Sequence, residues 1–304
     1  MEHQASIGLL MGRSHRQCYT PWARNTGGAF QCPSSPLALT RHRFEKNLVF
    51  QMKHSSSLNS INVLVPPDAA ASASANFDVA VPSKEVLELW RRANSVCFDV
   101  DSTVCLDEGI DELAEFCSAG KAVAEWTARA MGGSVPFEEA LAARLNIFKP
   151  SLKQVEAFLQ QRPPKISPGI VELVNMLKSR NVGVYLVSGG FRQMINPVAA
   201  ILGLPKENIY ANRLLFDSAG EFSGFDEKEP TSRSGGKATA VQRIRTNGKY
   251  KTLVMIGDGA TDLEARQPGC ADMFICYAGV QLRETVASKA DWAVFTFSDL
   301  IHSL

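Results

Sequence analysis

No stretch of this chain holds about 18 consecutive apolar residues, so the sequence predicts no membrane-spanning helix. Its seven cysteines lack closely spaced pairs, which argues against a disulfide framework and against a zinc site. Charge of one sign is also lacking, because 32 Lys and Arg face 31 Asp and Glu, and this balance argues against a protein that coats nucleic acid. Four of the five histidines lie within residues 1–54, so histidine catalysis is not expected in the rest of the chain. What the chain does have is length and apolar content, 304 residues at 45% hydrophobic, enough for one large domain or two moderate ones.

Residues 1–67 differ from the rest of the chain in charge. They hold seven Lys and Arg but two Asp and Glu, a net of +5, whereas the remainder has a net of −4. A serine-rich, acid-poor segment dotted with arginine is typical of an organelle transit peptide. We therefore expect residues 1–80 to be a transit peptide and linker, largely disordered, with cleavage between about 55 and 80. The hydroxyl-rich composition favours the plastid (chloroplast) over the mitochondrion, and a basic tail without a targeting role is the other alternative.

Five short apolar runs are typical of buried β-strands. These runs are residues 95–100, 182–187, 252–256, 273–276 and 292–295. Helical patterns lie between them, at residues 170–177, 237–246 and 261–267. Because continuous apolar strands alternate with helices, we predict an α/β fold, a Rossmann-like parallel sheet with helices on both faces.

One long stretch interrupts this alternation. Residues 108–162 show the pattern of four helices without a strand, and Pro163-Pro164 ends it. We therefore predict an inserted all-helical cap over residues 108–163, and a catalytic core formed by residues 81–107 and 164–304. Residues 214–222 have a turn-like centre and indicate a β-hairpin.

Polar residues follow three of the predicted strands. Asp99 and Asp101 come after the first strand, Ser188 after the second and Asp258 after the third, while Lys237 opens a helix. In an open parallel sheet, ligands bind beyond the carboxyl ends of the strands. We therefore expect these side chains to converge on one rim.

The residue types at this rim suit phosphoryl transfer. Asp99 and Asp258, on neighbouring strands, repel one another unless a cation lies between them, and magnesium prefers such hard oxygen ligands. A carboxylate neutralised in this way can attack phosphorus and form an aspartyl-phosphate. Asp101 can then protonate the departing oxygen and later deprotonate water. Lys237 and Ser188 can hold the phosphoryl oxygens by charge and by hydrogen bonds.

The motifs resemble the haloacid-dehalogenase superfamily and, within it, the phosphatases that act on phosphoserine. The resemblance rests on Asp99-Val100-Asp101-Ser102-Thr103, Ser188-Gly189-Gly190-Phe191, Gly236-Lys237 and Gly257-Asp258-Gly259-Ala260-Thr261-Asp262-Leu263, and it covers essentially all of residues 85–304. Two cap segments, residues 108–114 and 131–144, are more specific than the core motifs. The resemblance implies hydrolysis of O-phospho-L-serine to L-serine and phosphate with one Mg²⁺ ion, the last step of phosphorylated serine biosynthesis.

The resemblance also implies a role for each matching residue. It makes Asp99 the nucleophile and a metal ligand, and Asp101 the acid and base, with its backbone carbonyl on the metal. It makes Asp258 the third protein ligand of the metal, with Asp262 in support. The residues that it places around the substrate are Glu108, Met131, Gly132, Phe137, Arg144, Ser188, Gly189, Gly190, Lys237 and Thr261.

The charges of the expected substrate agree with this assignment. Phosphoserine carries an ammonium group and a carboxylate, and Glu108 and Arg144 offer the opposite charges on one lid. Arginine suits two-point binding of a carboxylate. A closing cap also excludes bulk water while the acyl phosphate forms. The expected partner is thus a small molecule, with no nucleic acid and no membrane, and the sequence does not indicate an oligomeric state.

Other interpretations stay open at this point. Glu108 and Arg144 can be ordinary surface charges, and Met131 and Phe137 can belong to the core of the cap. Asp262 can support the metal ligands without binding the metal itself. For the function, the alternatives are a phosphatase for another small phosphorylated metabolite, a phosphotransferase, and a binding protein without activity.

Overall fold

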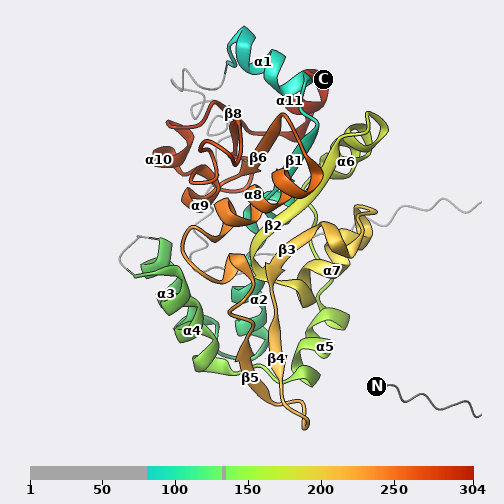
Figure 1. The fold of residues 1–304 in the computed structure, drawn as a ribbon. Coiled ribbons are helices and arrows are strands. Elements are labelled where there is room, and N and C mark those ends of the chain that lie inside the picture. The colour runs from blue at the N-terminus through green and yellow to red at the C-terminus, as the bar shows by residue number, and fades with distance from the viewer. Residues whose placement is uncertain (1–80, 132–134) are drawn as a thin grey trace, which may run out of the picture. The chain divides into compact units, whose positions relative to one another are not determined.

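The computed structural model describes residues 81–131 and 135–304, without the side chains of Ala130 and Met131 (Figure 1). The predicted leader over residues 1–80 lies outside the described residues, and so do Gly132 and the side chain of Met131. Within the described ranges, no helix is both long enough and apolar enough to cross a membrane.

A six-stranded parallel sheet forms the centre of the fold, with the strand order β3-β2-β1-β6-β7-β8. The strands are β1 (Ser95–Phe98), β2 (Gly183–Phe191), β3 (Ile209–Asn212), β6 (Leu253–Gly257), β7 (Met273–Tyr277) and β8 (Trp292–Val294). The chain runs outward from β1 to β3, then returns to β6 on the other side of β1. The reversal of strand order therefore falls between β1 and β6, which is where open parallel sheets bind ligands.

The strand predictions are confirmed, with differences at the ends of two strands and one strand that was not predicted. The predicted second strand, 182–187, extends to Phe191 in β2, so Ser188, Gly189 and Gly190 lie within it. The predicted first strand, 95–100, ends two residues early, because the chain leaves the sheet after Phe98 and turns through η3 (Val100–Val104). β3 was not predicted. It is four residues long and its apolar character is interrupted by Tyr210 and Asn212, so it lacks the continuous apolar run that marks the other strands.

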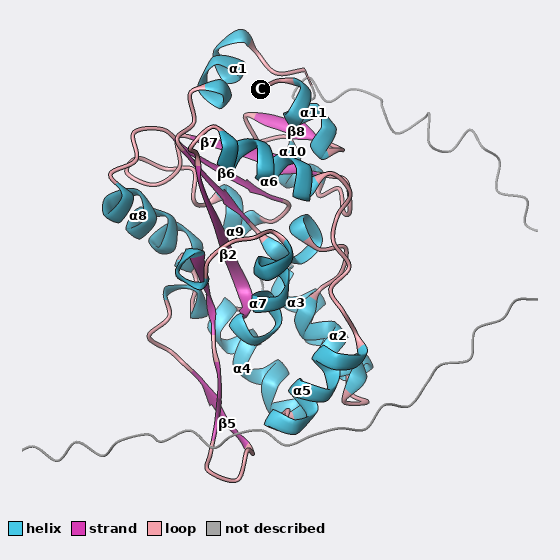
Figure 2. Ribbon diagram, turned by 90° about the vertical axis from the view of Figure 1, so that its right-hand side faces the viewer, coloured by secondary structure: helices cyan, strands magenta, loops and turns pink. Residues whose placement is uncertain are grey.

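Helices cover both faces of the sheet (Figure 2). The helices outside the insertion are α1 (Lys84–Arg91), α6 (Ile170–Ser179), α7 (Arg192–Ile201), α8 (Gly236–Gly248), α9 (Ala260–Leu263), α10 (Glu284–Ala287) and α11 (Phe297–His302), with the short turns η4 (Lys206–Asn208) and η5 (Pro230–Ser232). Side chains alternate along each strand, so Val96 and Phe98 pack with α1, α6, α7 and α11, whereas Cys97 packs with α8 on the opposite face. The predicted parallel sheet with two covered faces is therefore confirmed.

α9 is shorter than the predicted helix at residues 261–267. After Leu263 the chain forms tight turns, in which the backbone N–H of Ala265 donates to the Asp262 carbonyl and that of Arg266 donates to the Leu263 carbonyl. Gln267 precedes Pro268, and a residue before proline is disfavoured in the helical region. The apolar spacing of this segment therefore does not extend the helix.

Four helices occupy the stretch between η3 and α6 among the described residues, and they are called the helical insertion below. They are α2 (Gly109–Phe116), α3 (Gly120–Met131), α4 (Phe137–Phe148) and α5 (Leu152–Gln161). The predicted hairpin is present as β4 (Leu214–Phe216) and β5 (Phe222–Phe225), which pair in antiparallel fashion. It packs into the same apolar cluster as the helical insertion, and the backbone N–H of Leu152 on α5 donates to the Gly220 carbonyl in its turn at 2.9 Å. The division into a core and a cap at residues 107 and 163 stays a prediction.

Leu173 on α6 provides a test of the packing beneath the sheet. Its side chain is fully buried, so Leu173→Ala is expected to lower the free energy of unfolding by about 2–5 kcal/mol through lost burial and a residual cavity. The matched control is Leu215→Ala on β4, where the residue is 38% exposed and the expected loss is under about 1 kcal/mol. Urea unfolding followed by circular dichroism measures both, and equal losses would contradict this packing.

Candidate active site

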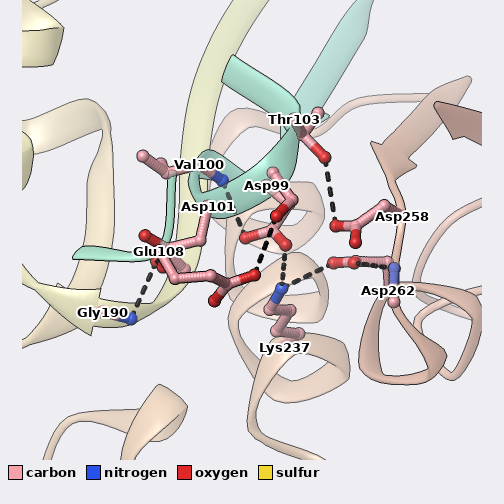
Figure 3. Close-up of polar contacts among 12 residues, drawn as sticks. Asp99, Val100, Asp101, Thr103, Glu108, Gly190, Lys237, Asp258 and Asp262 are labelled. Atoms are coloured by element: carbon pink, nitrogen blue, oxygen red, sulfur yellow. Dashed lines mark hydrogen bonds and ion pairs between the residues drawn. The ribbon is translucent and has the colours of Figure 1, made fainter. Parts of the chain in front are cut away.

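The predicted rim of polar residues is present at the carboxyl edge of the sheet (Figure 3). Asp99 follows β1 directly, and its backbone N–H donates to the Ile256 carbonyl of β6 at 2.9 Å. Asp258 follows β6, and Ser188 lies near the carboxyl end of β2. Because β2, β1 and β6 are consecutive in the sheet, residues about 90 and 160 positions apart in sequence come into contact.

Three buried carboxylates meet in the middle of this rim. One oxygen each from Asp99, Asp258 and Asp262 lies within 4.8 Å of the other two. The Lys237 ammonium is 2.8 Å from an oxygen of Asp99 and 2.8 Å from an oxygen of Asp262. Arg283 forms an ion pair with Asp258. The two cations therefore offset the repulsion among three buried acids.

Burial and neighbouring charges shift the pKa values of two groups in this cluster, Asp262 and Lys237. Burial, and then the charge of Asp99, raise the pKa of Asp262 to about 7. Burial alone would lower the pKa of Lys237, but the carboxylates of Asp262 and Asp99 raise it further than burial lowers it. Lys237 is therefore a fixed positive charge on the rim, of the kind that stabilises a phosphoryl group.

Asp101 lies in the η3 turn that leaves β1. The turn is tight enough to place Ser102 at φ 53°, in the left-handed region. One oxygen of Asp101 accepts from the Gly109 backbone N–H at 2.8 Å, and the other accepts from the Ser188 hydroxyl at 3.4 Å. The Ser188 hydroxyl in turn accepts from the Gly190 N–H at 2.8 Å. The carboxyl group is therefore oriented by contacts from both β2 and α2.

The protonation of Asp101 suits a group that gives and takes protons. Burial, followed by the nearby charges of Glu108 and Asp99, raises its pKa to about 7. A carboxyl group with a pKa near the working pH can act as an acid in one step and as a base in the next.

The helical insertion contributes two charged side chains to the site. Glu108 precedes α2 and accepts from the Ser102 hydroxyl at 2.8 Å, and burial raises its pKa. Arg144 on α4 is 7% exposed, and burial lowers its pKa while Asp111 and Glu108 oppose that shift. Neither residue is an ordinary surface charge.

The insertion also meets the rim through α4. The Phe137 ring lies against Gly189, where an added Cβ would come within 2.8 Å of the ring, so only glycine permits this approach. The Glu138 carboxylate accepts from the Ser234 backbone N–H and hydroxyl, both at 3.0 Å. α4 is thus fixed beside the loop that leads to Lys237.

A cavity of about 620 Å³ lies between the rim and the helical insertion. The predicted site residues that line it are Asp99, Asp101, Glu108, Phe137, Arg144, Gly189, Gly190, Lys237, Asp258 and Thr261. Ser188 and Asp262 are not in the lining, but they contact Asp101 and Lys237 directly. The structure therefore brings together every predicted site residue whose side chain it describes.

Two residues at the site were not assigned a role from the sequence. Arg283 lines the cavity and pairs with Asp258, and the Thr103 hydroxyl donates to Asp258 at 3.3 Å. Thr103 stands within the first motif. Arg283 belongs to no motif, but it follows β7, so the rule that ligands bind beyond strand ends could have found it.

The raised pKa of Asp101 predicts a pH-dependent difference in stability between the wild type and Asp101→Asn. The folded pKa of about 7 exceeds the ordinary value of about 4, so the contribution of this carboxyl is fully present below about pH 4 and is lost as pH rises through about 7. Asparagine does not ionise. In chelator-treated protein the variant is therefore expected to gain stability relative to wild type over that window, on the order of a few kcal/mol.

Urea unfolding at a series of pH values measures this difference. The control is Asp217→Asn, which replaces an exposed acid in the hairpin turn, outside the lining of the cavity. A difference for Asp101→Asn that did not change with pH would show that its carboxyl titrates in its ordinary range.

Comparison with known proteins places this site in a family. Residues 93–267, over half of the chain, match the family described as haloacid dehalogenase-like hydrolase. The chain is 67% identical over 259 residues to the chloroplastic phosphoserine phosphatase of Arabidopsis thaliana, which covers 85% of this chain and 88% of that protein. It is 48% identical over 224 residues to the phosphoserine phosphatase of Bos taurus, covering 74% of this chain and 99% of that one.

Solved structures agree with the sequence relatives. A structure described as a phospho-aspartyl intermediate analogue of phosphoserine phosphatase superposes with a TM-score of 0.60 at 26% identity, and the match covers 70% of this chain and 99% of that chain. The match of more than half the chain, the curated relatives and the shared fold all point the same way. This chain is an enzyme that belongs to the haloacid dehalogenase-like hydrolase family.

Proposed function

We propose that this protein hydrolyses O-phospho-L-serine to L-serine and phosphate, the reaction for which its relatives are named, and so completes a phosphorylated route to serine. The observation that carries the proposal is a single cavity with two chemically different ends. Asp99, Asp101 and Lys237 lie at the sheet end, and Glu108 and Arg144 come from the helical insertion. A phosphomonoester with an amino-acid head group matches both ends.

The reaction proceeds in two displacements at phosphorus. A carboxylate oxygen of Asp99 attacks the phosphorus, the bond from phosphorus to the serine oxygen breaks, and the departing oxygen takes the proton of Asp101. Asp101, now ionised, removes a proton from a water molecule, whose oxygen attacks the aspartyl-phosphate. The bond to Asp99 breaks, phosphate leaves, and Asp101 is again protonated.

Several groups hold the transferred phosphoryl group during both steps. Lys237 supplies a fixed positive charge, and the Ser188 hydroxyl and the Gly189 and Gly190 backbone supply hydrogen-bonding groups. Thr261 opens α9 at the wall of the same cavity and is a further contact for substrate.

The three-carboxylate cluster fits a divalent metal ion. Its donors are all hard oxygens, they are buried, and they lie close enough together to share one ion. We propose that Asp99, Asp258 and the backbone carbonyl of Asp101 hold one Mg²⁺, with Asp262 in support. When bound, the ion would neutralise Asp99 and the phosphoryl oxygens. With the ion bound, Lys237 and Arg283 would offset a smaller part of the negative charge of the three carboxylates.

The amino-acid end of the substrate lies against the helical insertion. Glu108 accepts hydrogen bonds from the ammonium group, and Arg144 donates to the carboxylate. Phe137 forms an apolar wall beside them. The contacts of Met131 and Gly132 with this part of the substrate stay a prediction, since Gly132 and the Met131 side chain lie outside the described residues. These contacts select phosphoserine over phosphate esters of other alcohols, and the same insertion excludes bulk water from the aspartyl-phosphate.

Asp99→Asn is expected to lower kcat for phosphoserine at least about a thousand-fold, because an amide is not a nucleophile toward phosphorus. Free phosphate released from phosphoserine measures the loss, with Asp217→Asn as the matched control of unchanged activity. Chelation of wild type is expected to stop phosphate release, and added Mg²⁺ to restore it. Near-normal turnover by Asp99→Asn would defeat the mechanism.

A panel of substrates in the same assay separates the rival functions. Equal turnover of phosphothreonine, phosphohomoserine and sugar phosphates would indicate a different small metabolite. Loss of ester without release of free phosphate, in the presence of another alcohol, would indicate a phosphotransferase. Absence of turnover with retained binding would indicate a binding protein.

We also propose that the protein works in the plastid after removal of an N-terminal transit peptide, as the name of the Arabidopsis thaliana relative suggests. Import into isolated chloroplasts is expected to shorten the chain at a site between about 55 and 80. N-terminal sequencing of the imported protein gives the site, and isolated mitochondria are the control. An intact Met1 on the imported protein, or processing by mitochondria alone, would contradict the proposal.

A further inference from the structure

A chain of three side chains crosses the helical insertion. Asp111 lies on α2, Thr127 on α3 and Arg144 on α4. The Thr127 hydroxyl donates to an oxygen of Asp111 at 2.9 Å and accepts from Nη1 of Arg144 at 3.4 Å. Thr127 is 8% exposed, and both it and Arg144 line the cavity.

The chemistry of the three groups fixes the direction of this chain. A carboxylate can only accept, a guanidinium can only donate, and a hydroxyl can do both at once. Thr127 must therefore donate to Asp111 and accept from Arg144. Because the hydroxyl proton of Thr127 is directed to Asp111, a lone pair of the same oxygen is left to accept from Arg144. The two contacts together give the hydroxyl a single orientation.

A second contact completes the orientation of the guanidinium. Nε of Arg144 donates to the Ala140 carbonyl at 3.3 Å, one turn earlier on α4. Together with the Thr127 contact, this fixes the plane of the group through Nε and Nη1. Neither contact uses the donors on Nη2, and Arg144 lines the cavity, so the planar group keeps donors for a carboxylate.

The position of Asp111 also offsets the cost of burying Arg144. A guanidinium that is 7% exposed loses most of its hydration, and Asp111 is the acid that contributes most to keeping it charged. Thr127 links the two charges through a hydroxyl. Asp111 therefore lies close to Arg144 but forms no direct ion pair with it. The remaining donors of the guanidinium are thus not occupied by Asp111.

We propose that Asp111 and Thr127 are positioning residues that orient Arg144 for the carboxylate of the substrate and thereby set the preference for an amino-acid phosphate. The inference rests on the proposed function, because it assigns Arg144 to that carboxylate. Thr127 contacts Arg144 directly, Asp111 acts on it through the Thr127 hydroxyl, and neither residue is among the reacting groups. Their effect should thus depend on whether the substrate has a carboxylate.

Two substrates isolate this effect. Phosphoserine and O-phosphoethanolamine share the phosphate and the ammonium group, and they differ by the carboxylate alone. Loss of the Thr127 hydroxyl is expected to lower kcat/KM for phosphoserine about tenfold, mainly through KM, because a hydrogen bond to a charged group is removed. For phosphoethanolamine the change is expected to stay within about twofold.

The variants are chosen so that packing and hydrogen bonding are separated. Thr127→Val keeps the shape of the side chain and removes the hydroxyl. Thr127→Ser keeps the hydroxyl and is expected to restore at least most of the preference. Asp111→Asn keeps an acceptor oxygen and loses the charge, so it is expected to reduce the preference less than Thr127→Val. Arg144→Lys measures how much preference for phosphoserine over phosphoethanolamine remains when the planar guanidinium is lost.

The outcomes distinguish this inference from the proposed function. A wild type that does not prefer phosphoserine to phosphoethanolamine overturns the proposed function and the inference with it. A wild type with that preference, retained in Thr127→Val, overturns the inference alone. Equal losses on both substrates in Thr127→Val, or no recovery in Thr127→Ser, show a merely structural role and also overturn it. If Thr127→Val fails to fold, Asp111→Asn decides: an unchanged ratio of the two kcat/KM values overturns the inference.

Discussion

The contact on which the site depends is the Lys237 ammonium held between Asp99 and Asp262, each at 2.8 Å. Adjacent parallel strands bring β1 and β6 to an end at the same edge, so acids that follow them are forced together. Removing one partner from a buried ion pair typically costs about 3–5 kcal/mol, since the charge left behind is uncompensated. The chain reaches this position through Gly235, at φ 71°, and Gly236, where a side chain would collide with the Pro230 carbonyl. The two glycines therefore set where α8 begins, and the ion pairs of Lys237 with Asp99 and Asp262 hold that end of the helix at the rim.

The two layers of the site divide the chemical work between them. The sheet rim supplies groups that any phosphate ester could use, because they address phosphorus and its oxygens. In the proposed function, Glu108, which precedes α2, and Arg144 on α4 bind charges that few phosphate esters carry in this arrangement. On this proposal, a change of substrate needs substitutions at positions such as Glu108 and Arg144 and none on the sheet. This division agrees with the ability of one scaffold to support many related reactions.

The sequence predicted those elements whose residue pattern has a single structural explanation. Long apolar runs serve only to be buried, so five of the six strands could be predicted, whereas β3 could not, because its polar positions break the run. Asp99 and Asp258 could be placed because they follow such strands. The Thr127 contact to Arg144 could not, since it depends on the angles at which the helices pack, and Arg283 was missed because it stands in no motif although it follows β7. α9 ended early for a local reason, the proline at 268, that apolar spacing does not register.

The hairpin shares an apolar cluster with the helices of the insertion, and this limits how that insertion can move. Phe216, Phe222 and Phe225 of the hairpin pack with the cluster formed by α2, α4 and α5. Separating them would bring the rings into water, at about 1.5–3 kcal/mol for each ring if it were fully exposed. We therefore expect the insertion and the hairpin to move as one unit, against Phe191 of β2 and Met194 of α7, which belong to the same cluster.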